Sequence, residues 1–197
     1  MRALLESVGL VARAYELPHD LLRDYQPEVA GCILLDLNLP EMTGLELLAR
    51  LDQRGRTQPF LIVTGNDSAQ SAVRAMKAGA CDYILKPFND EALLRGVHSA
   101  IALDARHRQT RQRHHQVLKA CQTLTQREAQ VMRLICTGCS NKQTAMQLGI
   151  SVKTLEAHRA QVMRKMNAQS LADLVRMQIV ASHPPEQSHE LVAALLQ

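Results

Sequence analysis

The sequence predicts an α/β domain with a parallel sheet, followed by an all-α domain of four helices. Three short apolar runs lie in the first hundred residues, at 33–36, 60–64 and 81–85, and segments of helical periodicity separate them. Beyond residue 104 only helical patterns occur. Alternating strands and helices favour a parallel sheet with helices on both faces.

The remaining elements of the first half follow from periodicity and turn residues. Residues 1–8 are typical of the end of an amphipathic helix closed by Gly9, and residues 10–15 predict a short strand. Helical patterns cover 44–51, 69–78 and 90–103, and Gly79 is placed to end the second of them.

The second half is predicted to begin with a helical linker and continue as a capped helical bundle. Residues 104–119 are polar and basic without Gly or Pro, which favours continuation of the preceding helix. Thr125 with Glu128, and Ser140 with Gln143, are capping boxes. Gly149 predicts a tight turn. The next helix then begins after a Ser151 cap and the last at Ser170, so residues 140–166 predict a helix-turn-helix.

Charge is divided unevenly along the chain. Residues 1–103 contain 10 Lys and Arg against 13 Asp and Glu, whereas residues 104–197 contain 13 against 6. Basic charge favours polyanions, because phosphate contacts release condensed counterions. The near absence of aromatic residues from the basic half disfavours stacking on single strands, so duplex DNA is the expected partner.

Composition narrows the class of protein. The 197 residues are 46% hydrophobic, enough for two small cores. No apolar stretch is long enough to span a bilayer and no signal-peptide pattern opens the sequence, so we expect a cytoplasmic protein without a membrane partner. The five cysteines lack the spacing of a disulfide framework, and a single Cys136–Cys139 pair disfavours a zinc site.

Polar side chains follow each predicted strand at its carboxyl end. Asp36, Thr64 and Lys86 come directly after the three apolar runs. The carboxyl ends of parallel strands meet at one edge of a sheet, where ligands bind. A carboxylate, a hydroxyl and an ammonium that meet there suit a phosphorylatable aspartate.

These motifs together resemble a known family. The runs Ile33-Leu34-Leu35-Asp36, Pro40-Glu41-Met42-Thr43-Gly44, Val63-Thr64-Gly65 and Asp82-Tyr83-Ile84-Leu85-Lys86-Pro87 are similar to the receiver domain of two-component response regulators. Residues 124–128, 138–142 and 149–159 resemble the LuxR-type DNA-binding domain. The combination resembles the NarL/FixJ class, with the FixJ branch as the nearest likeness.

The resemblance implies a fold and a set of boundaries. It implies a flavodoxin-like receiver at 1–103, a helical basic linker at 104–119, a four-helix LuxR-type domain at 120–183 and a tail at 184–197. It also implies a transcription regulator that is not an enzyme, phosphorylated by a sensor histidine kinase and dimeric when active.

The resemblance assigns roles in the receiver. Asp36 is the implied phosphoacceptor, Thr64 and Lys86 the groups that bind phosphoryl oxygens, and Tyr83 the aromatic whose rotamer follows Thr64. Pro87 is expected to follow a cis peptide bond.

The resemblance also implies a magnesium ion, normally held by an acidic pair at the end of a first strand. The sequence as given opens within what resembles the first helix, so the receiver is expected to lack that strand. Only Asp36 and the backbone carbonyl of Asn38 are then left as ligands, and a single carboxylate makes a weak site. A start assigned too far downstream is the favoured explanation; a truncated gene and a strand donated in trans are the others.

In the second half, the resemblance and the helical pattern together predict a DNA-reading surface. Leu155, Val162 and Met166 share one stripe and should pack inward. The expected DNA-binding residues are Asn141, Lys142, Lys153, Thr154, Glu156, Ala157, His158, Arg159, Ala160 and Lys165, of which Arg159 is expected to contact guanine or phosphate, and the lysines phosphate. The dimerisation residues are expected to be Leu171, Leu174 and Val175.

Two other functions compete with this interpretation. The first is a LuxR-type DNA-binding regulator whose degenerate receiver is not phosphorylated. The second is a phosphatase of the haloacid-dehalogenase type, which needs a second aspartate two positions after its nucleophile. Asn38 occupies that position, and this disfavours the enzyme.

Overall fold

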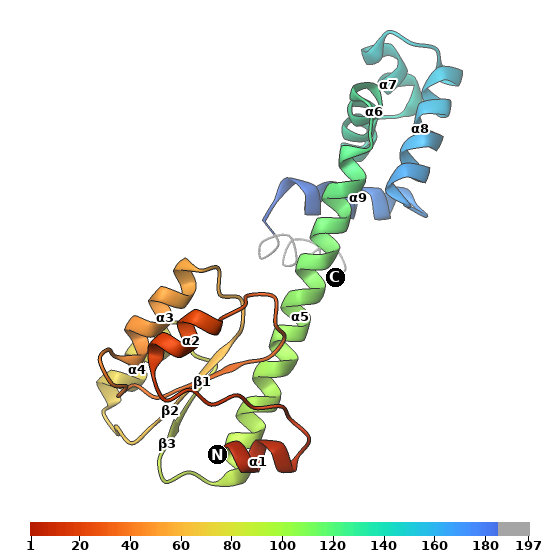
Figure 1. The fold of residues 1–197 in the computed structure, drawn as a ribbon. Helices are drawn as coiled ribbons and strands as arrows, with labels where there is room; N and C mark the ends of the chain where they lie inside the picture. The colour runs from red at the N-terminus through yellow and green to blue at the C-terminus, as the bar shows by residue number, and fades with distance from the viewer. Residues whose placement is uncertain (185–197) are drawn as a thin grey trace. The chain divides into compact units, whose positions relative to one another are not determined.

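A computed structural model describes residues 1–184 and divides the chain into two compact units, Met1–His107 and Arg108–Gln197. Each unit has its own hydrophobic core. The elements of both units are labelled in Figure 1.

The first unit is built on a three-stranded parallel sheet in the order β1-β2-β3. Its strands are β1 (Ile33–Leu35), β2 (Phe60–Thr64) and β3 (Asp82–Leu85). The central strand β2 is buried along its whole length, as expected for a strand covered on both faces. The prediction of a parallel sheet from the three apolar runs is therefore confirmed.

Helices cover both faces of this sheet (Figure 1). Phe60 and Ile62 of β2 pack with α2 (Pro18–Asp24), α3 (Gly44–Gln53) and α4 (Ala69–Lys77). Leu61 and Val63 point the other way, because successive strand residues face opposite sides, and they pack with α1 (Arg2–Ser7) and the first part of α5 (Asp90–Gln122).

One sequence prediction for the first unit was wrong, and one helix was missed. Residues 10–15 are not a strand, because a strand needs a hydrogen-bonded neighbour and no described residue pairs with this segment. The alternation of apolar residues in this segment is seen only in its packing: Leu10 and Ala12 lie against the core, whereas Val11 is exposed. Helix α2 was not predicted, although Pro18 at its first turn is a typical helix-start signal.

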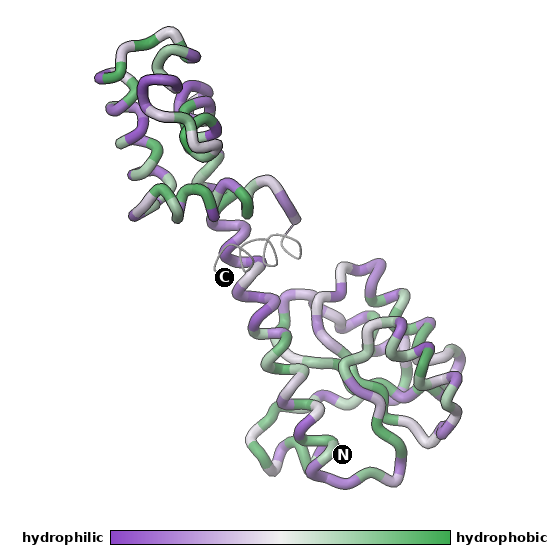
Figure 2. The backbone as a smooth tube through the Cα atoms, turned by 180° about the vertical axis from the view of Figure 1, so that it is seen from behind, coloured by the Kyte–Doolittle hydropathy of each residue, from purple (hydrophilic) through white to green (hydrophobic). Residues whose placement is uncertain are grey.

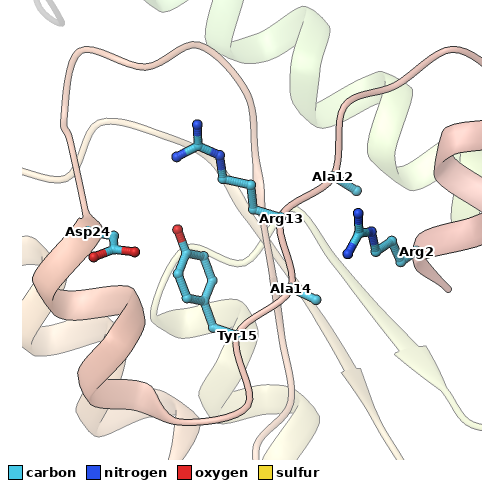
Figure 3. A pocket seen from close by; sticks show the side chains of 6 residues that line it. All are labelled: Arg2, Ala12, Arg13, Ala14, Tyr15 and Asp24. Carbon is cyan, nitrogen blue, oxygen red and sulfur yellow. The ribbon is translucent and has the colours of Figure 1, made fainter.

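An open hollow of about 260 Å³ borders this extended segment (Figure 3). It is lined by Arg2, by Ala12 to Tyr15 and by Asp24 of α2. The side chains of Arg13 and Tyr15 point to the side of the segment on which Asp24 lies (Figure 3). The lining includes none of Asp36, Thr64 and Lys86, so the hollow is separate from the predicted phosphoacceptor site.

The second unit consists of α6 (Gln126–Cys136), α7 (Asn141–Leu148), α8 (Val152–Met166) and α9 (Leu171–Ser182), with the end of α5. The predicted caps are all formed: the side chains of Thr125, Ser140, Ser151 and Ser170 each accept a hydrogen bond from the backbone three residues on. Gly149 adopts φ +64° between α7 and α8, a conformation that favours glycine. The helix-turn-helix prediction is confirmed.

Hydrophobic and hydrophilic residues alternate along the helices of this bundle (Figure 2). Leu155, Val162 and Met166 of α8 are buried in the core with Val131 and Ile135 of α6. The predicted inward stripe of α8 is therefore confirmed.

Helix α5 continues to Gln122, as expected for a helical linker. Asp104, expected to open that linker, is instead buried and accepts a hydrogen bond from the Gly31 amide. The first unit accordingly extends to His107, a few residues beyond the expected boundary. Of the expected tail at 184–197, residues 185–197 lie outside the described part. Within the described part no helix is long and apolar enough to cross a membrane.

Candidate functional site

Asp36, Thr64 and Lys86 meet at the carboxyl edge of the sheet. Asp36 follows β1, and its Oδ2 accepts a hydrogen bond from the Lys86 ammonium at 2.6 Å. Asp36 Oδ1 accepts from the Asn38 amide at 3.1 Å. The Asp36 and Lys86 side chains are 27% and 43% exposed, so the carboxylate is accessible to a reagent in solution.

The surroundings of Asp36 favour its ionised form. Partial burial raises its pKa, but hydrogen bonds from Lys86, the Asn38 amide and Thr64, together with the charge of Lys86, outweigh that effect and lower it. Asp36 is therefore a carboxylate at neutral pH. The ionised carboxylate is the form of an aspartate that can act as a nucleophile.

Thr64 and Tyr83 are linked through the loop after β2. Thr64 is fully buried, and its hydroxyl accepts a hydrogen bond from the Asn66 amide at 3.3 Å. The Tyr83 hydroxyl donates to the Asn66 carbonyl at 2.6 Å. The backbone of Asn66 therefore contacts both Thr64 and Tyr83. The sequence did not predict this contact, because it does not involve the Asn66 side chain.

The backbone around Asp36 is fixed by a close approach. A Cβ atom on Gly44 would lie 2.2 Å from the Asp36 carbonyl oxygen, so only glycine fits at the start of α3. The Gly44 amide donates to the Leu37 carbonyl at 2.9 Å, and Lys86–Pro87 is a cis peptide bond, as expected. The lack of space for a side chain thus explains why glycine ends the Pro40 to Gly44 motif.

The described residues do not fit a magnesium site of the receiver type. No group of three acidic, histidine or cysteine side chains that could hold a metal occurs in residues 1–184. Both Asp36 oxygens already accept hydrogen bonds, and the carboxylate of Glu41, in the same loop, is paired with His19 at 2.9 Å. The expected ligands, the Asp36 carboxylate and the Asn38 carbonyl, therefore gain no acidic neighbour that would complete a group of three in residues 1–184.

In the second unit, most of the predicted DNA-binding residues lie on one exposed face of α8. Lys142 of α7 is exposed, and Asn141 is half-buried. The exposed predicted residues of α8 are Lys153, Thr154, Glu156, Ala157 and Ala160, whereas His158 and Arg159 are half-buried. Arg159 donates a hydrogen bond to Asn141 Oδ1 at 3.0 Å, so the structure brings these two predicted residues together.

Lys165 is placed differently from the expectation of a phosphate contact. Its ammonium donates to Glu128 Oε2 at 2.6 Å and to the Thr123 carbonyl at 3.0 Å. Glu128 is almost fully buried, and the hydrogen bond from Lys165, assisted by the Thr125 amide, lowers its pKa to about 2. Lys165 therefore braces α8 against the start of α6, and we remove it from the DNA-reading surface.

The expected dimerisation residues divide into two groups. Leu174 is fully buried in the core of the second unit, so it cannot contact a partner, and that expectation was wrong. Leu171 is exposed and Val175 half-buried, and neither packs in the core cluster. Ile179, an apolar residue of the same helix, follows Val175 by the same spacing of four residues and is likewise outside the core cluster.

Comparison with known proteins gives the same two-part division. Residues 1–98 match the response regulator receiver domain, and residues 122–178 match the bacterial regulatory proteins of the luxR family. The chain is a response regulator of the NarL/FixJ class. The response regulator TodT of Pseudomonas putida is 36% identical over 90% of this chain and 78% of its own. The transcriptional regulatory protein FixJ of Azorhizobium caulinodans is 39% identical, over 92% and 86%.

Solved structures agree with this assignment. The structure of the response regulator StyR has a TM-score of 0.80 at 38% identity and covers 89% of both chains. Full-length FixJ from B. japonicum has a TM-score of 0.54 at 35% identity, over 92% of this chain and 89% of its own. The response regulator described here therefore has a flavodoxin-like receiver followed by a helical LuxR-type domain, and its family consists of transcription regulators.

Proposed function

We propose that this response regulator accepts a phosphoryl group on Asp36 from a sensor histidine kinase and binds promoter DNA through α8. The observation that carries the proposal is the ionised Asp36 carboxylate, held 2.6 Å from the Lys86 ammonium at the edge shared by three strands. A carboxylate oxygen would attack the phosphorus of the donor, form an acyl phosphate and release the donor's imidazole. Lys86 and the Thr64 hydroxyl would then bind the oxygens of the new phosphoryl group.

Phosphorylation is tested with acetyl phosphate and with a cognate kinase. The full chain is incubated with and without Mg²⁺, and acyl phosphate is measured by intact mass before and after hydroxylamine, with Asp36→Asn as the control. A gain of one phosphoryl group that hydroxylamine removes, and that Asp36→Asn lacks, is the expected result. If the wild-type chain and the Asp36→Asn variant are both phosphorylated, the phosphoryl group is on another residue.

A second candidate function is suggested by the finding that residues 1–184 contain no group of three acidic, histidine or cysteine side chains that could hold a metal. In it, the receiver is not phosphorylated and the LuxR-type domain binds DNA constitutively. The same experiment separates the two functions. The second function is supported if no acyl phosphate forms under any condition and if Asp36→Asn binds DNA with unchanged affinity.

For the DNA-binding unit, we propose Asn141, Lys142, Lys153, Thr154, Glu156, Ala157, His158, Arg159 and Ala160 as the contact surface. Exposed charge and the helix-turn-helix geometry of α7 and α8 support this set. We place the receiver at 1–107, the DNA-binding domain at 120–183, and the protein in the cytoplasm, where promoter DNA is reached.

For dimerisation, we propose the stripe of Leu171, Val175 and Ile179 on α9. The apolar character of these residues and their position outside the core support it. Val175→Asp should shift the active full chain toward monomer in sedimentation, since it places a charge at the centre of an apolar contact. Arg176→Asp on the same helix is the matched control, and an equal shift by both variants would point away from this stripe.

A further inference from the structure

We propose that Asn141 is a positioning residue that holds Arg159 for sequence-specific reading of DNA, so that the two side chains act as one specificity determinant. This inference rests on the proposed DNA-binding function. Its basis is the hydrogen bond from the Arg159 guanidinium to Asn141 Oδ1, which joins the first residue of α7 to the middle of α8.

Asn141 is free to serve Arg159 because the cap of α7 is complete without it. Ser140 accepts from the Gln143 amide, and the Gln143 side chain accepts from the Ser140 amide. These two bonds form the capping box. The contact with Arg159 is therefore not a by-product of helix capping.

The chemistry of the partner matters, because an amide orients a guanidinium without neutralising it. Arg176 and Lys165 are paired with the carboxylates of Asp173 and Glu128. Arg159 is held by a neutral oxygen and has no carboxylate partner among the described residues, although Glu156 lies one turn earlier. Its full positive charge and its other N–H groups stay available for guanine or phosphate.

Arg159 lies at the border of the exposed face of α8, because the residues one turn away are the exposed Glu156 and the buried Val162. Its side chain is therefore held at the edge of the proposed reading surface. An arginine side chain held in place before binding loses less conformational entropy when it meets a base edge. Removing Asn141 should therefore weaken recognition of the correct sequence more than general attraction to DNA.

The test uses the full chain and two probes. One probe is a duplex selected by the wild-type chain from a randomised library, and the other is a scrambled duplex of the same length and composition. The specificity ratio is the dissociation constant for the scrambled duplex divided by that for the selected one, both measured at one salt concentration. Arg159→Ala should lower it by about 5- to 150-fold, and Asn141→Ala by about 2- to 12-fold.

The double variant distinguishes positioning from independent contacts. If Asn141 acts through Arg159, Asn141→Ala in the Arg159→Ala background should lower the ratio no further. Gln147→Ala, an exposed position on the same helix, is the matched control and should leave the ratio unchanged. Thermal unfolding of each variant, expected to match that of wild type, separates a binding effect from loss of fold.

The outcomes separate the inference from the function on which it rests. A wild-type chain that selects no sequence removes the proposed DNA-reading function and the inference with it. The inference alone is overturned if Arg159→Ala lowers the specificity ratio as expected but Asn141→Ala lowers it by the same factor with and without Arg159. It is also overturned if Asn141→Ala weakens binding to both duplexes equally.

Discussion

Two lysine–carboxylate pairs, one in each unit, have the same length and different surroundings. Asp36–Lys86 and Glu128–Lys165 both measure 2.6 Å. The first pair is 27% and 43% exposed at the end of a sheet, whereas the second is 7% and 23% exposed between helices. Bond length alone therefore does not distinguish a pair that solvent can reach from a structural brace, whereas exposure does.

The largest expected effect is the loss of the buried pair. Lys165→Met should destabilise the second unit by about 2–4 kcal/mol, because it leaves the Glu128 carboxylate buried without its cation. Amide hydrogen exchange of α6 and α8 in the full chain measures the free energy of opening. Exchange no faster than in wild type would show that the Thr125 amide alone satisfies Glu128.

The second effect concerns the backbone that holds the exposed pair. Gly44→Ala should cost about 1–3 kcal/mol in the first unit, since its Cβ would overlap the Asp36 carbonyl. Chemical denaturation measures the cost, with Gly65→Ala as control, because no atom lies within 4 Å of a Cβ at that position. Equal costs for the two variants would contradict the steric argument.

The third prediction concerns acid. The pKa of Glu128 in the folded chain is about 2, below its ordinary value of 4.5, so its contribution to stability is present above pH 4.5 and is lost as pH falls toward 2. The protection factors of the α6 amides, which correct for the pH dependence of intrinsic exchange, should fall in wild type over that window. Glu128→Gln, which cannot titrate, should show a shallower dependence on pH, and identical slopes would count against the brace.

The smallest effect on stability is expected at the exposed pair. Lys86→Met should change the stability of the first unit by less than about 1 kcal/mol, because exposed ion pairs contribute little. It should nevertheless raise the pKa of Asp36, since the hydrogen bond and the charge of Lys86 both lower it. Carboxyl carbon chemical shifts followed against pH report this change, and an unaltered Asp36 titration would show that the Asn38 amide and Thr64 suffice.

The sequence predicted the elements whose signals are local. The capping residues Thr125, Ser140, Ser151 and Ser170 mark their helices within four residues, and the three strands were visible as apolar runs. The meeting of Asp36 with Lys86 followed from the rule that parallel strands end at one edge. These predictions needed no knowledge of which surfaces pack together.

Helix α2 was missed despite its local Pro18 signal, but the other failures involve partners distant in the chain. Residues 10–15 alternate like a strand, yet a strand also requires a neighbour, which alternation cannot reveal. Lys165 resembles any basic residue of a DNA-reading helix until α6 brings Glu128 to it. Leu174 and Val175 are adjacent apolar residues, and only the packing of α9 decides which one is buried.

The close contact at Gly44 has a mechanical consequence for signalling. The first turn of α3 touches the Asp36 carbonyl, so the main chain of Asp36 cannot yield in that direction when a bulky group is attached to its side chain. With phosphorylation as proposed, we expect the displacement on the other side, at Lys86 and Thr64, whose side chains hydrogen-bond to the carboxylate. Movement would thus propagate toward Asn66 and Tyr83, with α3 as the fixed support.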